Sequence, residues 1–190
     1  MKTTTKPSAA VALLMIIIPV SGLAAGQRAP DLAAYASRLT AYAALHRDVE
    51  RPLPRLEAFT DPAEGLAAAV TLREALIAAR PAAREGELFG SAAPSLRREV
   101  RLALRRAGVE AADLLAEMQA DTEEGARPAV VNAPFPWAAG NLMPPCVIAA
   151  LPPLPPELEY RLIGPDLVLI DIDASLVIDI LRGVLFAPTR

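Results

Sequence analysis

The chain has 190 residues, of which 53% are hydrophobic and 22% charged, and its formal net charge is −3. Its only lysines are Lys2 and Lys6, so the part after residue 26 carries 17 arginines against 22 acidic residues, a net charge of −5. That balance argues against a nucleic-acid-binding domain. The single cysteine, Cys146, allows no internal disulfide. We expect it to be buried, with an intermolecular bridge as the alternative.

The first 26 residues predict a secretory signal peptide. A basic start (1–6) precedes an apolar run (9–20) and a group of small residues (21–26). The apolar run is shorter than the ~20 residues of a membrane-spanning helix. We therefore expect cleavage near Ala24–Gly26 and a periplasmic or secreted protein with no stable membrane span. The alternative is a retained N-terminal anchor.

The next region, residues 27–127, contains four segments with helical spacing of apolar residues. They run from Asp31 to Val49, from Thr60 or Asp61 to Pro81, from Ser91 or Ser95 to Ala107, and from Val109 to Glu123. The second has the clearest start, because a capping residue precedes Pro62 in the first turn. In the first, His46 falls on the same stripe as Tyr35 and Tyr42.

Residues 128–156 are rich in proline and predict an extended connector. Ala129–Val131 could form a short strand, and Cys146–Leu151 could form a short helix. Phe135 and Trp137 lie in a loop stiffened by prolines. Such aromatics can anchor a partner or a sugar, or they can close the end of a small core.

The tail, residues 157–190, changes to a period of two. Leu158, Tyr160 and Leu162 alternate with charged residues, whereas Val168, Ile170 and Ile172 alternate with two leucines and two aspartates; a third run covers 176–181. We interpret the tail as a three-stranded antiparallel meander whose apolar face is covered by the helices. The prediction is one α+β domain over residues 27–190.

The pairing of the first two strands determines what the acidic residues of the meander do. Keeping Tyr160 and Ile170 on one side leaves two registers. One sets Glu159 opposite Asp171 and Glu157 opposite Asp173, whereas the other sets Arg161 opposite Asp171. The first gathers carboxylates that suit a hard cation such as Ca²⁺, and in the second the arginine neutralises them. In both registers we expect the acids to point toward solvent.

Searches for catalytic motifs return nothing specific. The chain has no nucleophile elbow, P-loop, dinucleotide fingerprint or zinc-ligand spacing, so we predict no catalytic residue, metal ligand or cofactor. His46 and Cys146 would form a base and a nucleophile only if the fold brought them together. Three arginines, Arg97, Arg101 and Arg105, line one helix face. That face could meet anionic lipid or polymer, or could be solvated and paired with the acidic fourth helix.

Two resemblances follow from particular segments. The stretch 151–161, the runs 167–171 and 177–179, and Arg84–Phe89 resemble an uncharacterised family of exported bacterial proteins, to which no activity is assigned. Over about 30 residues the tail is also similar to the C-terminal meander of periplasmic RcnB-like proteins. Those proteins are linked to nickel and cobalt homeostasis, and the resemblance implies the fold more than the function.

The sequence thus predicts an exported cell-envelope protein, most simply a binding or structural module without catalysis, with another envelope protein as its partner. The residues expected to form the surfaces that bind this partner are Phe135, Trp137, Glu157, Glu159, Arg161, Asp171, Asp173 and Asp179. One alternative is a metal-responsive periplasmic protein that uses the carboxylates. A second is a hydrolase of unrecognised type.

Overall fold

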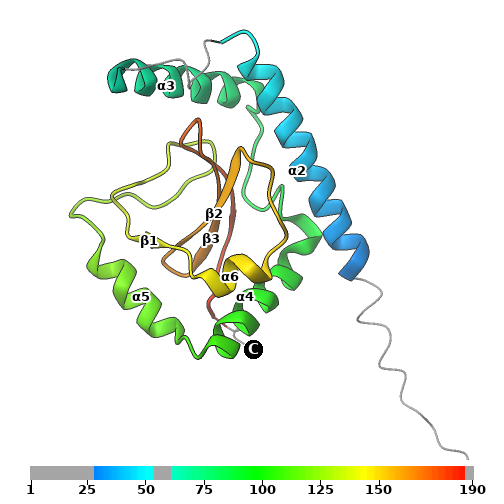
Figure 1. Cartoon of the computed structure of the whole chain (residues 1–190), viewed down its shortest axis with the longest axis vertical. Helices are drawn as coiled ribbons and strands as arrows, with labels where there is room; N and C mark the ends of the chain where they lie inside the picture. Colours follow the sequence, from blue (N-terminus) through cyan, green and yellow to red (C-terminus); the bar gives the residue numbers. More distant parts are fainter. Residues whose placement is uncertain (1–27, 54–60, 187–190) are drawn as a thin grey trace, which may run out of the picture.

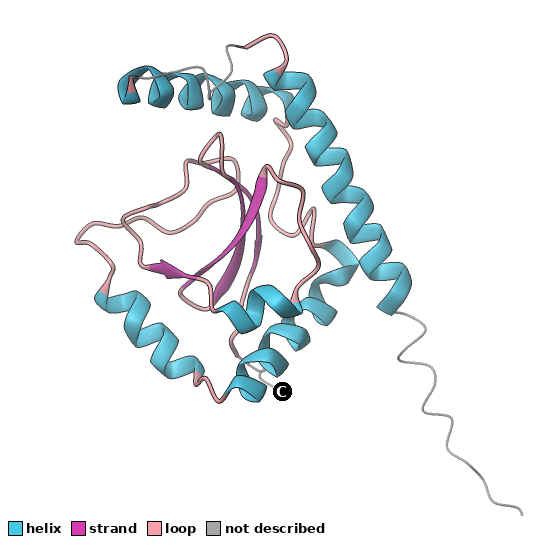
Figure 2. Ribbon diagram, in the orientation of Figure 1, coloured by secondary structure: helices cyan, strands magenta, loops and turns pink. Residues whose placement is uncertain are grey.

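The computed structural model describes residues 28–53 and 61–186, so the predicted signal peptide lies outside the described chain. The fold is α+β, with helices around a small antiparallel sheet (Figures 1 and 2). The elements are α2 (Arg28–Glu50), α3 (Pro62–Ala79), α4 (Ala93–Ala107), α5 (Ala111–Ala120), β1 (Asn141–Leu142), α6 (Pro145–Ala150), β2 (Leu158–Ile163), β3 (Asp166–Asp171) and β4 (Leu176–Leu181). No helix among them is long and apolar enough to cross a bilayer.

The four predicted helices are present, and their ends follow local signals. Asp61 caps α3 by accepting a hydrogen bond from the Ala63 amide at 2.8 Å. Gly108 ends α4 in the left-handed conformation, with a φ of 67°. The fourth helix, α5, is shorter than predicted at both ends.

The sheet has four strands in the order β1-β2-β3-β4, one more than predicted. The additional strand comes from the proline-rich connector, where Asn141 pairs with Ile163. Two residues are too few to show an alternating pattern. The connector also forms the predicted short helix as α6, but 129–131 is not a strand.

The register between β2 and β3 is shifted by one residue from the first predicted register and by three residues from the second. Tyr160 pairs with Leu169 and Glu159 with Ile170. The connection is a two-residue turn whose first residue, Gly164, has a φ of 52°. That conformation suits a tight hairpin and is easy for glycine.

The register is possible because both faces of the sheet are buried. On one face the strands meet all the helices, and this main core includes Tyr35, Leu39, Leu72, Leu76, Leu96, Val100, Leu114, Val147, Tyr160, Leu162, Leu167 and Leu169. On the other face a second core consists of Ala129, Phe135, Val168, Ile170, Val177 and Ile180. The connector covers this second face and follows β4, since the Asn132 amide donates to the Val177 carbonyl at 2.9 Å.

This arrangement overturns the prediction that the acids of the meander point outward. Asp171 and Asp179 lie on the helix-facing side of the sheet and are 0% exposed. Ile172, expected in the core, is 43% exposed. Both predicted registers assumed that only one face of the sheet is buried, whereas β3 is apolar from Leu167 to Ile170 and is buried on both faces.

Asp179 attaches the loop before α4 to the sheet. Its carboxylate accepts hydrogen bonds from the backbone amides of Gly86, Leu88, Phe89 and Ile180, at 2.6–2.8 Å. Arg38 of α2 holds the same loop by donating to the carbonyls of Leu88 and Phe89. The loop is therefore fixed between α2 and β4.

We predict that Asp179→Asn lowers the free energy of unfolding by about 3 kcal/mol, because an amide NH₂ would face amide donors that lose their acceptor. Urea unfolding measures the change. Glu159→Gln is the control, since Glu159 makes only a partly exposed ion pair with Arg161 and should cost less than about 0.5 kcal/mol. Equal stability of both variants would contradict a structural role for Asp179.

Candidate functional site

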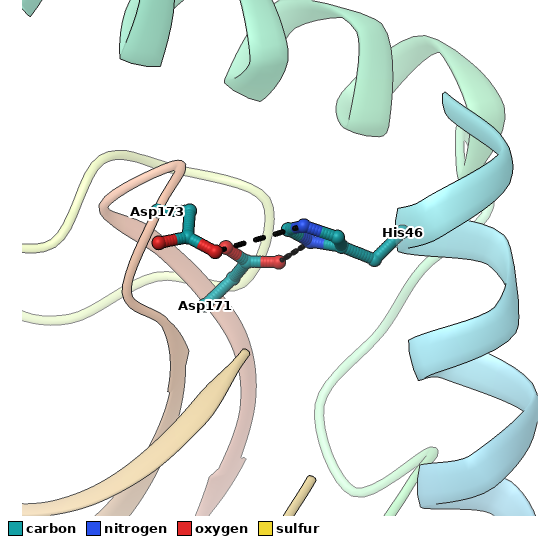
Figure 3. A group of neighbouring side chains, drawn as sticks. All are labelled: His46, Asp171 and Asp173. Carbon is teal, nitrogen blue, oxygen red and sulfur yellow. Dashed lines mark hydrogen bonds and ion pairs between the residues drawn. The ribbon is translucent and has the colours of Figure 1, made fainter. Parts of the chain in front are cut away.

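Where the last turn of α2 meets the end of β3, four ionisable side chains converge. We call them the His46 cluster: His46, Asp171 at the end of β3 and Asp173 in the turn to β4, with Glu50 of α2 joined to them through His46. Figure 3 shows His46 pointing from its helix toward the two aspartates. One atom each of His46, Asp171 and Asp173 lies within 4.8 Å of the others.

The fold positions each member for a simple reason. His46 continues the buried stripe of α2 after Leu39 and Tyr42, so the helix carries it into the main core. Glu50 follows one turn later on the same side of the helix. Asp171 is the last residue of a strand whose alternation turns it toward the helices.

Asp171 determines the orientation of the imidazole. Its Oδ2 lies 2.6 Å from His46 Nδ1 and also accepts a hydrogen bond from the Tyr42 hydroxyl at 2.8 Å. Its Oδ1 accepts from the Ala174 amide at 3.0 Å. Because an ionised carboxylate only accepts, Nδ1 carries the proton, and the neutral ring presents the lone pair of Nε2.

The other ring nitrogen has an unusual environment. Nε2 is buried and has no hydrogen-bond partner among the described residues. It faces Asp173 Oδ2 and Glu50 Oε2, each at 3.7 Å. That separation is too long for a hydrogen bond.

The pKa values of the cluster reflect its excess of carboxylates. Burial lowers the pKa of His46, but the hydrogen bond to Asp171 and the charges of Asp171, Glu50 and Asp173 together raise it above 6.5. Burial and the neighbouring carboxylates raise the pKa of Asp173. Burial and Asp171 also raise the pKa of the Tyr42 hydroxyl, so it remains a donor.

Glu157 adds a fourth carboxylate beside the cluster. It precedes β2 and acts electrostatically on Asp173 and Tyr42. Arg47 pairs with Glu157 Oε1 at 3.0 Å, whereas Oε2 is buried without a hydrogen-bond partner in the described chain. For Glu50, Asp171 and Asp173, the only ion pairs within the described residues are those with His46.

The predicted carboxylate surface therefore does not exist as one patch. Asp171 and Asp173 come together at His46 with Glu157 beside Asp173, whereas Asp179 is saturated by backbone amides elsewhere. Glu159 lies on the other side of the sheet and pairs with Arg161 at 2.7 Å. The second predicted register set Arg161 opposite Asp171, whereas in the structure Arg161 pairs with Glu159.

The two aromatic residues of the connector have different roles. Phe135 is 3% exposed and fills the second core. Trp137 is 58% exposed, packs edge-on against Phe135 at 4.5 Å and donates its indole N–H to Ser175 at 2.7 Å. Phe135 closes a core, and only Trp137 presents a surface.

The other predicted candidates also have structural partners. Cys146 lies on α6, which packs against α4, whereas the polar contacts of His46 are with Asp171, Asp173 and Glu50, so the predicted base and nucleophile are not paired. Arg97 and Arg101 on α4 donate to the carbonyls of Arg182 and Phe186. These arginines hold the C-terminal segment, and within the described residues they form no ion pair with α5.

The sequence predicted that His46 lies on the apolar stripe of the first helix, but it was not expected to bind a ligand. Tyr42 and Glu50 were not among the predicted site residues. A signal was present in the four-residue spacing of Tyr42, His46 and Glu50, which places three polar groups along one side of a helix. The pattern could not show that this side meets Asp171.

No family model, curated protein or solved structure matches the chain. Two of the four segments that carry the first resemblance, Arg84–Phe89 and 177–179, lie together, because Asp179 binds the loop amides. The resemblance itself stays a prediction.

We predict a single-proton pH dependence of stability in chelator-treated protein. The pKa of His46 is raised in the folded state, so its protonated form stabilises the fold. This contribution is complete below about pH 6.5 and is lost as the pH rises through the folded-state pKa, with a slope of at most about 1.4 kcal/mol per pH unit. Urea unfolding between pH 5.5 and 9 measures the slope.

His46→Gln is the control, since the chain has no other histidine. The variant should lose the slope over this range. An unchanged slope in His46→Gln would show that another group titrates.

Proposed function

We propose that this protein is an exported, non-catalytic binding protein of the cell envelope, and that its ligand is a cation bound at the His46 cluster. The observation that carries the proposal is the charge of the cluster. Glu50, Asp171 and Asp173 surround one buried imidazole, and a fourth carboxylate, Glu157, acts on Asp173 and pairs with Arg47.

The position of the cluster also favours a cation. The C-terminal end of α2 carries the negative end of the helix dipole, and the cluster begins one turn before that end. The side chains of Glu50 and Asp173 are 34% and 40% exposed, so an ion can reach them from solvent. His46 and Asp171 form the buried floor, and Glu50 and Asp173 form the accessible rim.

Export is part of the proposal and rests on the basic, apolar and small segments of residues 1–26. We expect the protein expressed with its leader to be recovered from the envelope fraction. Mass spectrometry should find a mature N-terminus near residues 25–27. A full-length product in the cytoplasmic fraction would contradict export without affecting the cation site.

Cation binding should raise the melting temperature of chelator-treated mature protein. At a free cation concentration about 100-fold above Kd, the stabilisation is about 2.7 kcal/mol. In a domain of this size that corresponds to roughly 5–10 °C. Thermal melts with Ca²⁺, Mg²⁺, Mn²⁺, Zn²⁺ and Co²⁺, each tested alone, measure the shift.

A double variant, Glu50→Gln with Asp173→Asn, should lose the shift because it removes the rim charges. Asp48→Asn with Glu159→Gln is the matched control, since it removes the same charge and the same residue types from exposed ion pairs elsewhere. The control should keep the shift. The proposal fails if no cation raises the melting temperature of the wild type.

A further inference from the structure

We infer that the His46 cluster binds a first-row divalent metal ion or Zn²⁺ through His46 Nε2, Asp173 and Glu50, with Asp171 as the residue that orients the imidazole. This inference rests on the proposed function, because it specifies the cation and its ligands at the same site. The carboxylates alone would select a cation that prefers oxygen ligands, and the imidazole adds one nitrogen ligand.

The first step is that Asp171 fixes the orientation of the His46 imidazole and the position of its proton. Asp171 engages both of its oxygens, with His46 Nδ1, the Tyr42 hydroxyl and the Ala174 amide. A histidine that gives its Nδ1 proton to a carboxylate has its Nε2 lone pair exposed and made more basic. This is the usual arrangement of histidines that bind metal ions.

The second step is the position of Nε2. A buried ring nitrogen without a partner costs free energy, and this nitrogen is aimed at two carboxylate oxygens at 3.7 Å. Coordination bonds of about 2.0–2.2 Å place two ligand atoms roughly 3.0–3.5 Å apart. A shift of a few tenths of an ångström in the partly exposed side chains of Glu50 and Asp173 brings each oxygen to that distance from Nε2.

The third step is the chemistry of the donor set. One imidazole nitrogen and two carboxylate oxygens suit Zn²⁺, Mn²⁺, Fe²⁺ or Co²⁺, whereas Ca²⁺ and Mg²⁺ prefer oxygen ligands throughout. The site offers no thiolate to a soft metal ion, because the one cysteine of the chain, Cys146, lies on α6. The charges also match, because Glu50 and Asp173 bring two negative charges to a dication.

The fourth step is the origin of the ligands. His46 and Glu50 are one turn apart on α2, and Asp173 lies in the turn after β3. An ion held by all three ties the C-terminal half of α2 to the sheet, so it should stabilise the folded protein. A bound metal replaces no hydrogen bond, because Asp171 keeps the bonds that it makes to Nδ1, Tyr42 and Ala174.

The test uses metal-free mature protein without an affinity tag, labelled with ¹⁵N in its only histidine. Calorimetric titration with Zn²⁺, Co²⁺ and Ca²⁺ gives affinities, and ¹⁵N NMR follows the two ring nitrogens separately. We expect one Zn²⁺ per chain, bound at least 100-fold more tightly than Ca²⁺. Zn²⁺ should shift the Nε2 resonance strongly while Nδ1 keeps its proton, and Co²⁺ should broaden the ring signals.

The variant His46→Gln should lose at least 100-fold in Zn²⁺ affinity and little in Ca²⁺ affinity. The control pair Asp48→Asn and Glu159→Gln should bind Zn²⁺ like the wild type. If His46→Gln does not fold, the wild-type Nε2 resonance decides alone.

The outcomes separate this inference from the proposed function. Cation binding with an unchanged Nε2 resonance, or equal Zn²⁺ affinity in His46→Gln, overturns the nitrogen ligand and leaves a carboxylate site. Ca²⁺ binding as tight as Zn²⁺ binding does the same. If none of the three ions binds, the inference fails, and the cation proposal fails with it when Mg²⁺ and Mn²⁺ also leave the melting temperature unchanged.

Discussion

Burial of two carboxylates between the sheet and the helices constrains the rest of the structure. An ionised group with no partner in a protein interior costs several kcal/mol, so it is tolerated only where partners are in place. Asp179 obtains its partners from backbone amides of the loop before α4, and Asp171 from His46, Tyr42 and the turn after β3. Alternative positions of α2 or of the loop would leave one carboxylate unpaired.

The same type of side chain serves two different purposes at these positions. Four amides surround Asp179 and leave it no capacity for other chemistry. Asp171 holds one nitrogen of an imidazole, and the opposite nitrogen then faces carboxylates without reaching them. A carboxylate bound by the main chain is a structural clamp, whereas one bound to a histidine leaves a second donor atom for a ligand. This difference is why the proposed function lies at Asp171 and not at Asp179.

The second core explains why so few charged residues of the tail form a surface. Because the connector covers the far side of the sheet, Val168 and Ile170 have a place to be buried, and Leu167 and Leu169 can face the helices. The proline-rich segment that was expected to act as a spacer is therefore part of the core. Its exposed aromatic side chain is Trp137, which Phe135 and Ser175 hold in one orientation.

Local signals in the sequence were sufficient for the helices, the change of period in the tail and the α+β class, because capping, proline placement and apolar spacing act within a few residues. They also placed His46 on the buried side of its helix. They could not supply the strand register, since alternation indicates one buried face only when the other is in water, and β3 is apolar from Leu167 to Ile170 without alternation. The His46 cluster joins residues about 125 positions apart, and only packing of α2 against the sheet brings them together.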